Sequence, residues 1–329
     1  MNNRYLHITR RQAIATTVAS LAGAAVIGRA GAGAQALQTL RVVGLPIDGW
    51  KGVYYGVKSG LFKRYGLDVQ TTISPSGAAA AAALSGGAAD IAYTNTLTAV
   101  QAHSHNIPMV FVATGNFLLP GKSPTLMLVS KDSPIKSGRD MNGKVLGSAS
   151  VRDINAAASF AWIDKTGGDS SSVHVIEVPA SAGAAALEQH RVDAVILNEP
   201  AASLALATGN VRVLAQPYDA MIGGMAAGLV ALTPVIEAKT DAMSRFAKAM
   251  HEASTWTNAH QAETVPMVAE YTGVEADVIA KGARFTDADY LETRYLQPLI
   301  EVFAKYKLID KPFPAQEMIS SVAVKAPRR

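Results

Sequence analysis

Two polar positions recur 103 residues apart, in the same local pattern. Asp90 and Asn95 flank the short apolar run 91–93, and Asp193 and Asn198 flank the apolar run 194–197. An alanine-rich segment precedes each run and ends in a matching leucine, Leu84 or Leu187. An asparagine amide both donates and accepts hydrogen bonds, whereas an ionised carboxylate only accepts them. Polar groups of this kind are suited to holding a small ligand.

Each copy is typical of a short helix that leads into a buried strand, with polar groups just past the strand's end. In an open α/β sheet, ligands bind beyond the carboxyl ends of the strands. Two such units predict two lobes of one design with a cleft between them. The alternative is a chance alignment of two low-complexity alanine segments.

Three predicted helix starts should face this cleft, and their unpaired N–H groups favour contact with an anion. Arg152 could clamp a carboxylate or sulfonate through two parallel hydrogen bonds, or be an exposed partner of Asp153. Glu199 could accept from an amine or ring N–H, or cap the helix that Pro200 begins. Trp50 could stack on a planar ligand, or pack a helix against the sheet.

The remaining candidates are polar or small residues at strand ends and helix starts. Residues 94–96 are suited either to hydrogen bonding with the ligand or to capping the following helix. The full set of expected ligand-binding residues is Gly49, Trp50, Ser76, Gly77, Thr94, Asn95, Thr96, Asn116, Ser150, Arg152, Asn198 and Glu199.

No catalytic, metal or cofactor site is expected. The chain has no cysteine, which excludes thiolate chemistry, disulfides and a lipid-bearing cysteine. It has no Gly-x-Ser-x-Gly or His-Glu-x-x-His motif, and residues 121–123 match a phosphate loop incompletely. His103 and His105 stand two apart, a spacing that does not place them on one helix face.

Strands and helices alternate along the chain, which predicts parallel sheet. We expect strands near 40–45, 68–73, 109–113, 123–130, 173–178 and 211–215, and helices over 53–64, 154–165, 241–259, 262–271 and 290–306. The chain should change lobe twice, at hinge strands 124–130 and 225–233. Residues 37–125 and 233–329 would then form lobe 1, and residues 126–232 lobe 2.

The first 36 residues are typical of an export signal. Arg10 and Arg11 begin a twin-arginine-like motif, a modestly apolar stretch follows, and Ala34-Gln35-Ala36 fits a cleavage site. An ordinary secretory signal is the alternative. The protein should therefore be periplasmic and soluble, without a lipid anchor.

The basic excess of the chain belongs to this segment. Four of the 30 basic residues and no acidic residue lie in it, so 26 basic and 26 acidic residues remain. The net charge gives no support for a nucleic-acid or membrane partner.

Several motifs carry a resemblance to a known family. The chain is similar to ABC-transporter periplasmic substrate-binding proteins in residues 56–69, the unit through Asp90-Ile91-Ala92, Arg191-Val192-Asp193-Ala194, Glu199-Pro200 and the tail 299–310. The resemblance is to the nitrate/sulfonate/taurine type, with relatives that bind the pyrimidine precursor of thiamine. It implies a two-lobed type II periplasmic-binding-protein fold with a mixed, mostly parallel sheet in each lobe and hinge closure on the ligand.

The function that follows is capture of a small organic solute for an ABC importer. Arg152 and Glu199 together favour an aminosulfonate, a carboxylate or a similar nitrogen or sulfur compound over nitrate or a sulfate ester. The expected partners are the ligand and the membrane permease, with the protein a monomer. The alternative is an exported α/β enzyme, such as a hydrolase, acting in the same cleft.

Overall fold

The structure is a computed structural model that describes residues 36–119, 121, 123–221 and 223–327. The expected export signal, residues 1–36, lies outside this range except for Ala36. Across the described residues, no helix combines the length and apolar character needed to cross a membrane.

The first sheet has five strands, four of them parallel. Their order is β2 (Leu67–Ile73), β1 (Gln38–Gly44), β3 (Ile91–Asn95), β11 (Ala227–Leu232) and β4 (Met109–Ala113), and β11 runs against its neighbours. Successive side chains alternate between two cores: Val42 joins a cluster with α1 (Lys51–Lys58), α2 (Leu61–Arg64) and α9 (Thr240–Ala259), whereas Val43 joins one with α3 (Gly77–Ser85), α4 (Thr96–Ser104) and α12 (Thr293–Lys305). The sheet is therefore buried on both faces.

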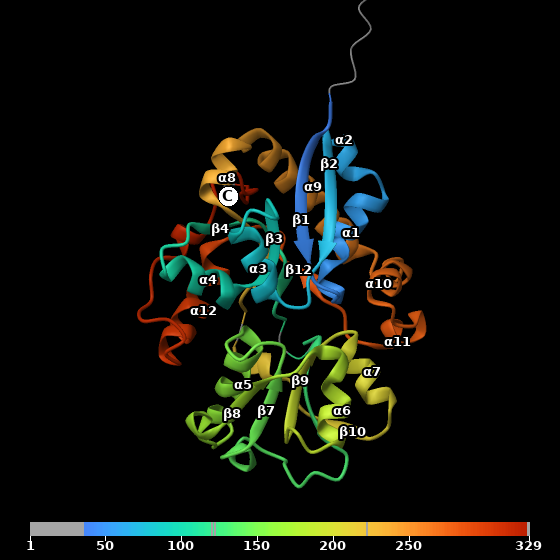
Figure 1. The fold of residues 1–329 in the computed structure, drawn as a ribbon, viewed down its shortest axis with the longest axis vertical. Coiled ribbons are helices and arrows are strands. Elements are labelled where there is room, and N and C mark those ends of the chain that lie inside the picture. The colour runs from blue at the N-terminus through green and yellow to red at the C-terminus, as the bar shows by residue number, and fades with distance from the viewer. Residues whose placement is uncertain (1–35, 120, 122, 222, 328–329) are drawn as a thin grey trace, which may run out of the picture. The chain divides into compact units, whose positions relative to one another are not determined.

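The second sheet repeats this arrangement (Figure 1). Its order is β8 (His174–Glu177), β7 (Val145–Ser148), β9 (Ala194–Asn198), β6 (Thr125–Ser130) and β10 (Val211–Ala215), with β6 antiparallel to both neighbours. Helix α5 (Ile154–Lys165) contributes to one core cluster, and α6 (Gly183–Glu188) and α7 (Ala201–Ala207) contribute to the other. Mixed, mostly parallel sheets flanked by helices confirm the expected fold class.

The sequence repeat coincides with equivalent elements of the two sheets. Strands β3 and β9 are offset by 103 residues at both ends, and each occupies the centre of its sheet. Leu84 and Leu187 are fully buried in the helices that precede them. The repeat therefore reflects two copies of one helix–strand unit.

Shorter elements complete the chain. The expected helix over 53–64 is divided into α1 and α2 because Gly60 adopts a left-handed conformation between them. The elements that were not expected include α11 (Ala276–Lys281) and the paired strands β5 (Asn116–Phe117) and β12 (Thr286–Asp287). The others are α8 (Thr233–Ala238), α10 (Val265–Thr272), and the 3-10 turns η1 (Asp48–Trp50), η2 (Arg139–Met141), η3 (Ser170–Ser172), η4 (Ala180–Ala182), η5 (Pro217–Ala220) and η6 (Ala315–Met318).

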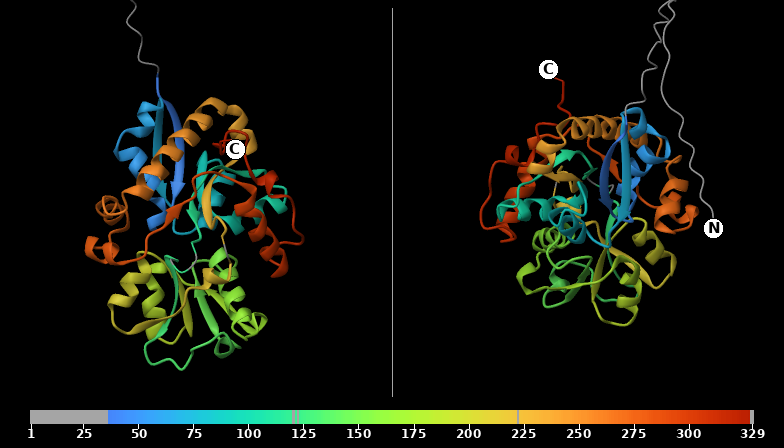
Figure 2. Two further views of the ribbon diagram at one scale, coloured as in Figure 1. Left: turned by 180° about the vertical axis from the view of Figure 1, so that it is seen from behind. Right: turned by 45° about the horizontal axis from the view of Figure 1, so that its top comes forward.

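The return crossing lies earlier in the chain than the sequence predicts. Strand β11, expected within 126–232 of the second lobe, hydrogen-bonds instead to β3 and β4 of the first sheet. The two connections between the sheets therefore run from β5 to β6 and from η5 to β11 (Figure 2). Leu118 N donates to Gly224 O and Ala226 N donates to Asn116 O, so the connections pair with each other beside the first sheet.

Candidate functional site

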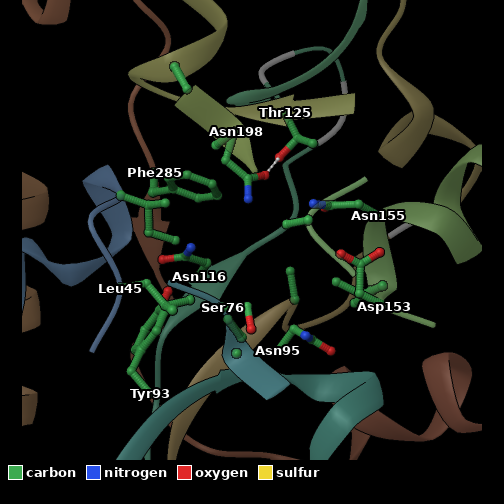
Figure 3. Close-up of a pocket in the computed structure, with 18 of the residues that line it drawn as sticks. Leu45, Ser76, Tyr93, Asn95, Asn116, Thr125, Asp153, Asn155, Asn198 and Phe285 are labelled. Carbon is green, nitrogen blue, oxygen red and sulfur yellow. Dashed lines mark hydrogen bonds between the residues drawn. The ribbon is translucent and has the colours of Figure 1, made fainter. Parts of the chain in front are cut away.

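A cavity lies where the carboxyl ends of strands from both sheets converge (Figure 3). Residues 45–47 follow β1, Asn95 ends β3, Ala149 follows β7 and Asn198 ends β9. The cavity has a volume of about 110 Å³, counted as the space that the centre of a water molecule can occupy. A single buried water needs about 10–15 Å³ by the same measure. The space is therefore large enough for a small solute.

Three helices begin at the cavity, each with its capping side chain in the lining. Ser76 Oγ accepts the N–H of Ala79 in α3, and Asn95 Oδ1 accepts the N–H of Thr98 in α4. Asp153 Oδ1 accepts the N–H of Ala156 in α5 at 2.9 Å. The positive ends of three helix dipoles therefore point at one space, which favours an electronegative ligand group there.

Four asparagines from four elements line the same cavity: Asn95, Asn116, Asn155 and Asn198. Two of them are held by hydroxyl groups of the second lobe's wall. Thr125 Oγ1 donates to Asn198 Oδ1 at 2.7 Å, and Tyr218 Oη donates to Asn155 Oδ1 at 2.8 Å. These bonds fix the acceptor oxygens and leave the amide N–H groups as donors for the ligand.

Asp153 is the one ionisable carboxyl group among the lining residues, and it is 5% exposed. Burial raises its pKa to about 6, although hydrogen bonds from the Ala156 backbone and Ser148 Oγ act in the opposite direction. Its two oxygens already accept from these groups, at 2.9 and 3.1 Å. Asp153 is therefore chiefly a helix cap, and its charge adds a negative contribution on that side of the cavity.

The rest of the wall is apolar or aromatic. The large apolar side chains of the lining are Leu45, Ile47, Ile154 and Phe285, and Tyr93 and Tyr218 supply phenol rings. Among the lining residues none is lysine, arginine or histidine. Across the described part of the chain, no three His, Cys, Asp or Glu side chains are placed to hold a metal ion.

Five of the twelve expected site residues line the cavity: Ser76, Gly77, Asn95, Asn116 and Asn198. Each lies at a strand end or helix start, as the sequence pattern predicts. The remaining seven residues are absent from the cavity lining.

The two charged candidates do not reach the cavity. Arg152 Nη2 donates to the carbonyl oxygen of Leu308, which follows shortly after the end of α12. Glu199 is buried and accepts from the backbone N–H and the hydroxyl of Ser203, at 3.0 and 2.9 Å. Arg152 was expected to bind an anionic group of the ligand, and Glu199 to accept a hydrogen bond from an amine. Both side chains instead make hydrogen bonds within the protein. Ser150, in the same loop as Arg152, is also absent from the lining.

The other four are buried and are absent from the lining. Trp50 is 1% exposed, with its ring over Gly44 and its edge against Tyr93. It is therefore a packing residue of the first lobe. Thr94 Oγ1 donates to Gly77 O at 2.9 Å, and Thr96 Oγ1 donates to Met225 O. Gly49 is buried beside Trp50.

Sequence reasoning missed several lining residues, above all Tyr93, Thr125, Asn155, Tyr218 and Phe285. Asn155 follows the helix cap Asp153 by two residues, so a search of the first helical turn would have found it. Tyr93 stands within an apolar strand, and nothing in its local sequence distinguishes it from a core residue.

Comparisons with known proteins identify a family and a set of related folds. A family model described as "NMT1/THI5 like" matches residues 49–264, more than half of the chain. The chain is 27% identical over 210 residues to a putative aliphatic sulfonates-binding protein of Escherichia coli K12, and the match spans 63% of each protein. The aligned part is thus less than two thirds of that relative.

Solved structures share the fold. The periplasmic aliphatic sulphonate binding protein SsuA of Escherichia coli superposes with a TM-score of 0.68 at 22% identity, covering 86% of this chain and 97% of that one. The desulfurization enzyme DszB superposes with a TM-score of 0.63 at 14% identity, covering 86% and 96%. The fold therefore occurs in a binding protein and in an enzyme.

Proposed function

This chain belongs to the NMT1/THI5-like family, and on that premise we propose that it is the extracytoplasmic solute-binding component of an ABC importer. Membership agrees with the resemblance carried by its sequence motifs. The proposed activity is capture of a small organic solute in the cavity between the two sheets, followed by delivery to a membrane permease.

The observation that carries this proposal is the convergence of equivalent strand ends on one cavity. Asn95 ends β3 and Asn198 ends β9, and both side chains are in the lining. A site assembled from two lobes closes on its ligand when the lobes approach, which is how hinged binding proteins enclose a solute. The likeness to a sulfonate-binding relative is in keeping with such a role.

We further propose an organic ligand with an acidic group, such as an aminosulfonate or an aromatic or other carboxylate. The acidic group would lie at the starts of α3 and α4, where the neutral side chains of Ser76 and Asn95 cap the helices, and away from the Asp153 carboxylate. Backbone N–H groups and amide donors replace the arginine clamp that the sequence predicts. The apolar wall around Phe285 would cover the rest of the molecule.

An enzyme on this fold is the second candidate, because DszB shares it. Catalysis by nucleophilic attack needs a nucleophile within hydrogen-bond reach of a base. The serine and threonine hydroxyls of the lining, those of Ser76 and Thr125, are bonded to protein groups, and the lining set contains no histidine or lysine. These contacts support ligand binding over turnover.

Thermal denaturation against a metabolite panel, run beside a product assay, tests the proposal. The panel would hold aminosulfonates, alkyl and aryl sulfonates, carboxylates and their amides. A ligand that raises the melting temperature and is recovered unchanged supports a binding protein. Formation of product would support the enzyme, and failure of every compound to bind would contradict the proposed function.

A further inference from the structure

Two polar atoms on the first-sheet wall of the cavity make no hydrogen bond within the described residues. They are the hydroxyl of Tyr93 and Oδ1 of Asn116, and each side chain belongs to a residue that is 2% exposed. Both residues line the cavity and lie on the same side of it in Figure 3. Buried polar atoms are nearly always hydrogen-bonded, so a buried pair without partners calls for a functional explanation.

The packing brings these two groups together. A Cβ atom added at Gly49 would lie 2.5 Å from both the Tyr93 hydroxyl and Asn116 Oδ1, and 2.4 Å from Asn116 Nδ2. Such contacts are far inside van der Waals range, so any side chain at position 49 would displace the pair. Gly49 therefore serves the site indirectly, by leaving room for Tyr93 and Asn116.

The opposite wall carries a tyrosine–asparagine pair that is satisfied. Tyr218 is buried in the same cavity, and its hydroxyl donates to Asn155 Oδ1 at 2.8 Å. The two pairs have the same chemistry and similar burial, and they differ in whether the protein completes the hydrogen bond. Tyr218 is therefore a matched control for Tyr93.

The charges around Tyr93 disfavour an anion beside its hydroxyl. The carboxylates of Asp48 and Asp287 lie near enough to raise the pKa of the Tyr93 hydroxyl further, after burial as the main cause. Lys51 pairs with Asp48 at 3.3 Å and also acts on Asp287, and Arg284 pairs with Asp48. Two cations therefore face two carboxylates here, and neither cation is left over for a ligand's negative group. An acceptor such as Asn116 Oδ1 requires a donor from the ligand.

We propose that Tyr93 and Asn116 form a specificity-determining subsite that binds an uncharged N–H or O–H group of the ligand, such as a primary amide. This inference rests on the proposed function and deepens it. The ligand's acidic group, where it has one, is placed at the starts of α3 and α4, which belong to the same lobe as this subsite. The neutral end of the molecule then completes the hydrogen bonds that the first lobe leaves open.

The first experiment needs no ligand. Tyr93→Phe and Asn116→Leu remove the unpartnered atoms with little change of shape, whereas Tyr218→Phe leaves Asn155 Oδ1 without its donor. We expect the first two variants to melt at or above the wild-type temperature and Tyr218→Phe to melt below it. A clear loss of stability in Tyr93→Phe, equal to that of Tyr218→Phe, would show that its hydroxyl has a structural partner and would overturn the inference.

The second experiment measures binding to matched pairs of primary amides and carboxylates, from acetamide and acetate to benzamide and benzoate, with the corresponding sulfonates. We expect at least one amide to bind wild type more tightly than its acid. Tyr93→Phe and Asn116→Leu should weaken that amide at least about fivefold, the loss of one neutral hydrogen bond. Tyr65→Phe, which removes a surface hydroxyl bonded to Glu252, is the control without effect on binding.

The outcomes of these experiments distinguish failure of the subsite from failure of the proposed solute-binding function. Binding of a carboxylate or sulfonate that neither variant weakens, without binding of any amide, overturns the subsite and leaves the binding protein standing. Wild type that binds no compound of either panel contradicts the proposed function itself.

Discussion

Asp90 and Asp193 accept the same hydrogen bond in the two sheets. Asp90 Oδ2 accepts the backbone N–H of Arg41 in β1 at 2.9 Å, and Asp193 Oδ2 accepts that of Val145 in β7, also at 2.9 Å. Each carboxylate stands one residue before the central strand that ends in a cavity-lining asparagine. The pair therefore sets the register of β3 on β1 and of β9 on β7, and thereby positions Asn95 and Asn198.

Asp90→Asn should destabilise the protein more than Asp193→Asn. The Asp90 carboxylate also pairs with Arg41 and Lys239 at 3.0 Å and is 5% exposed, whereas Asp193 is 36% exposed. We expect a loss of about 1–2 kcal/mol in the free energy of unfolding for Asp90→Asn and less than about 1 kcal/mol for Asp193→Asn. Urea denaturation at pH 7 measures both, and equal losses would contradict this difference.

The contribution of Asp90 should also depend on pH. Burial acts to raise its pKa, but hydrogen bonds from the side chain and backbone of Arg41 and from Lys239 outweigh burial and lower it. A carboxyl whose pKa is lower in the folded state stabilises the fold at neutral pH, and that contribution is lost as the pH falls below about 4. The destabilisation by Asp90→Asn should accordingly shrink toward acid pH.

Asp153 should show the opposite dependence. Burial raises its pKa to about 6 in the folded protein, above the value of about 3.9 for an unfolded aspartate. The folded state therefore takes up the proton first, and its stability relative to Asp153→Asn should increase as the pH falls from 6 toward 4. Asparagine retains the helix cap, so parallel pH profiles of the two proteins between pH 4 and 7 would show that this carboxyl does not titrate as stated.

Arg152→Ala should have little effect on the affinity for the ligand. The guanidinium donates to the Leu308 carbonyl at 3.2 Å and is absent from the cavity lining. Loss of one exposed contact between the lobes should weaken binding by less than about fivefold. Calorimetry with any ligand from the panel measures this, and a loss of a hundredfold or more would restore the anion clamp that the sequence predicts.

Ligand binding should reduce the radius of gyration. The segments that join the sheets pair through Leu118 with Gly224 and Ala226 with Asn116, which makes them the natural hinge. We expect small-angle scattering to record a more compact particle at saturating ligand. An unchanged profile would argue against hinge closure.

The mature protein should begin near Leu37 and occur in the periplasmic fraction. The basis is the Arg10-Arg11 motif and the small residues that end at Ala36. N-terminal sequencing of the periplasmic protein measures the cleavage site, and Arg10→Lys with Arg11→Lys tests the twin-arginine route. An intact Met1 on the periplasmic protein would contradict cleavage.

The sequence by itself determined the repeated unit and the edge of each sheet at which the candidate site lies. Alternation along a strand and the capping preference of Asn95 and Ser76 are local properties, so residues close in sequence predict them. For the same reason the strands 109–113 and 211–215 and the helix 154–165 agree with the structure residue by residue. The family resemblance rests on motifs of the same local kind.

Tertiary packing decided which side chains reach the cavity. Arg152 and Glu199 lie next to lining residues in the chain, yet nearby acceptors and donors, Leu308 O and the Ser203 groups, draw them away. Tyr93 is in the lining because Gly49, 44 residues earlier, leaves space beside it. The direction of a long side chain depends on partners brought close by the fold, and local sequence does not contain them.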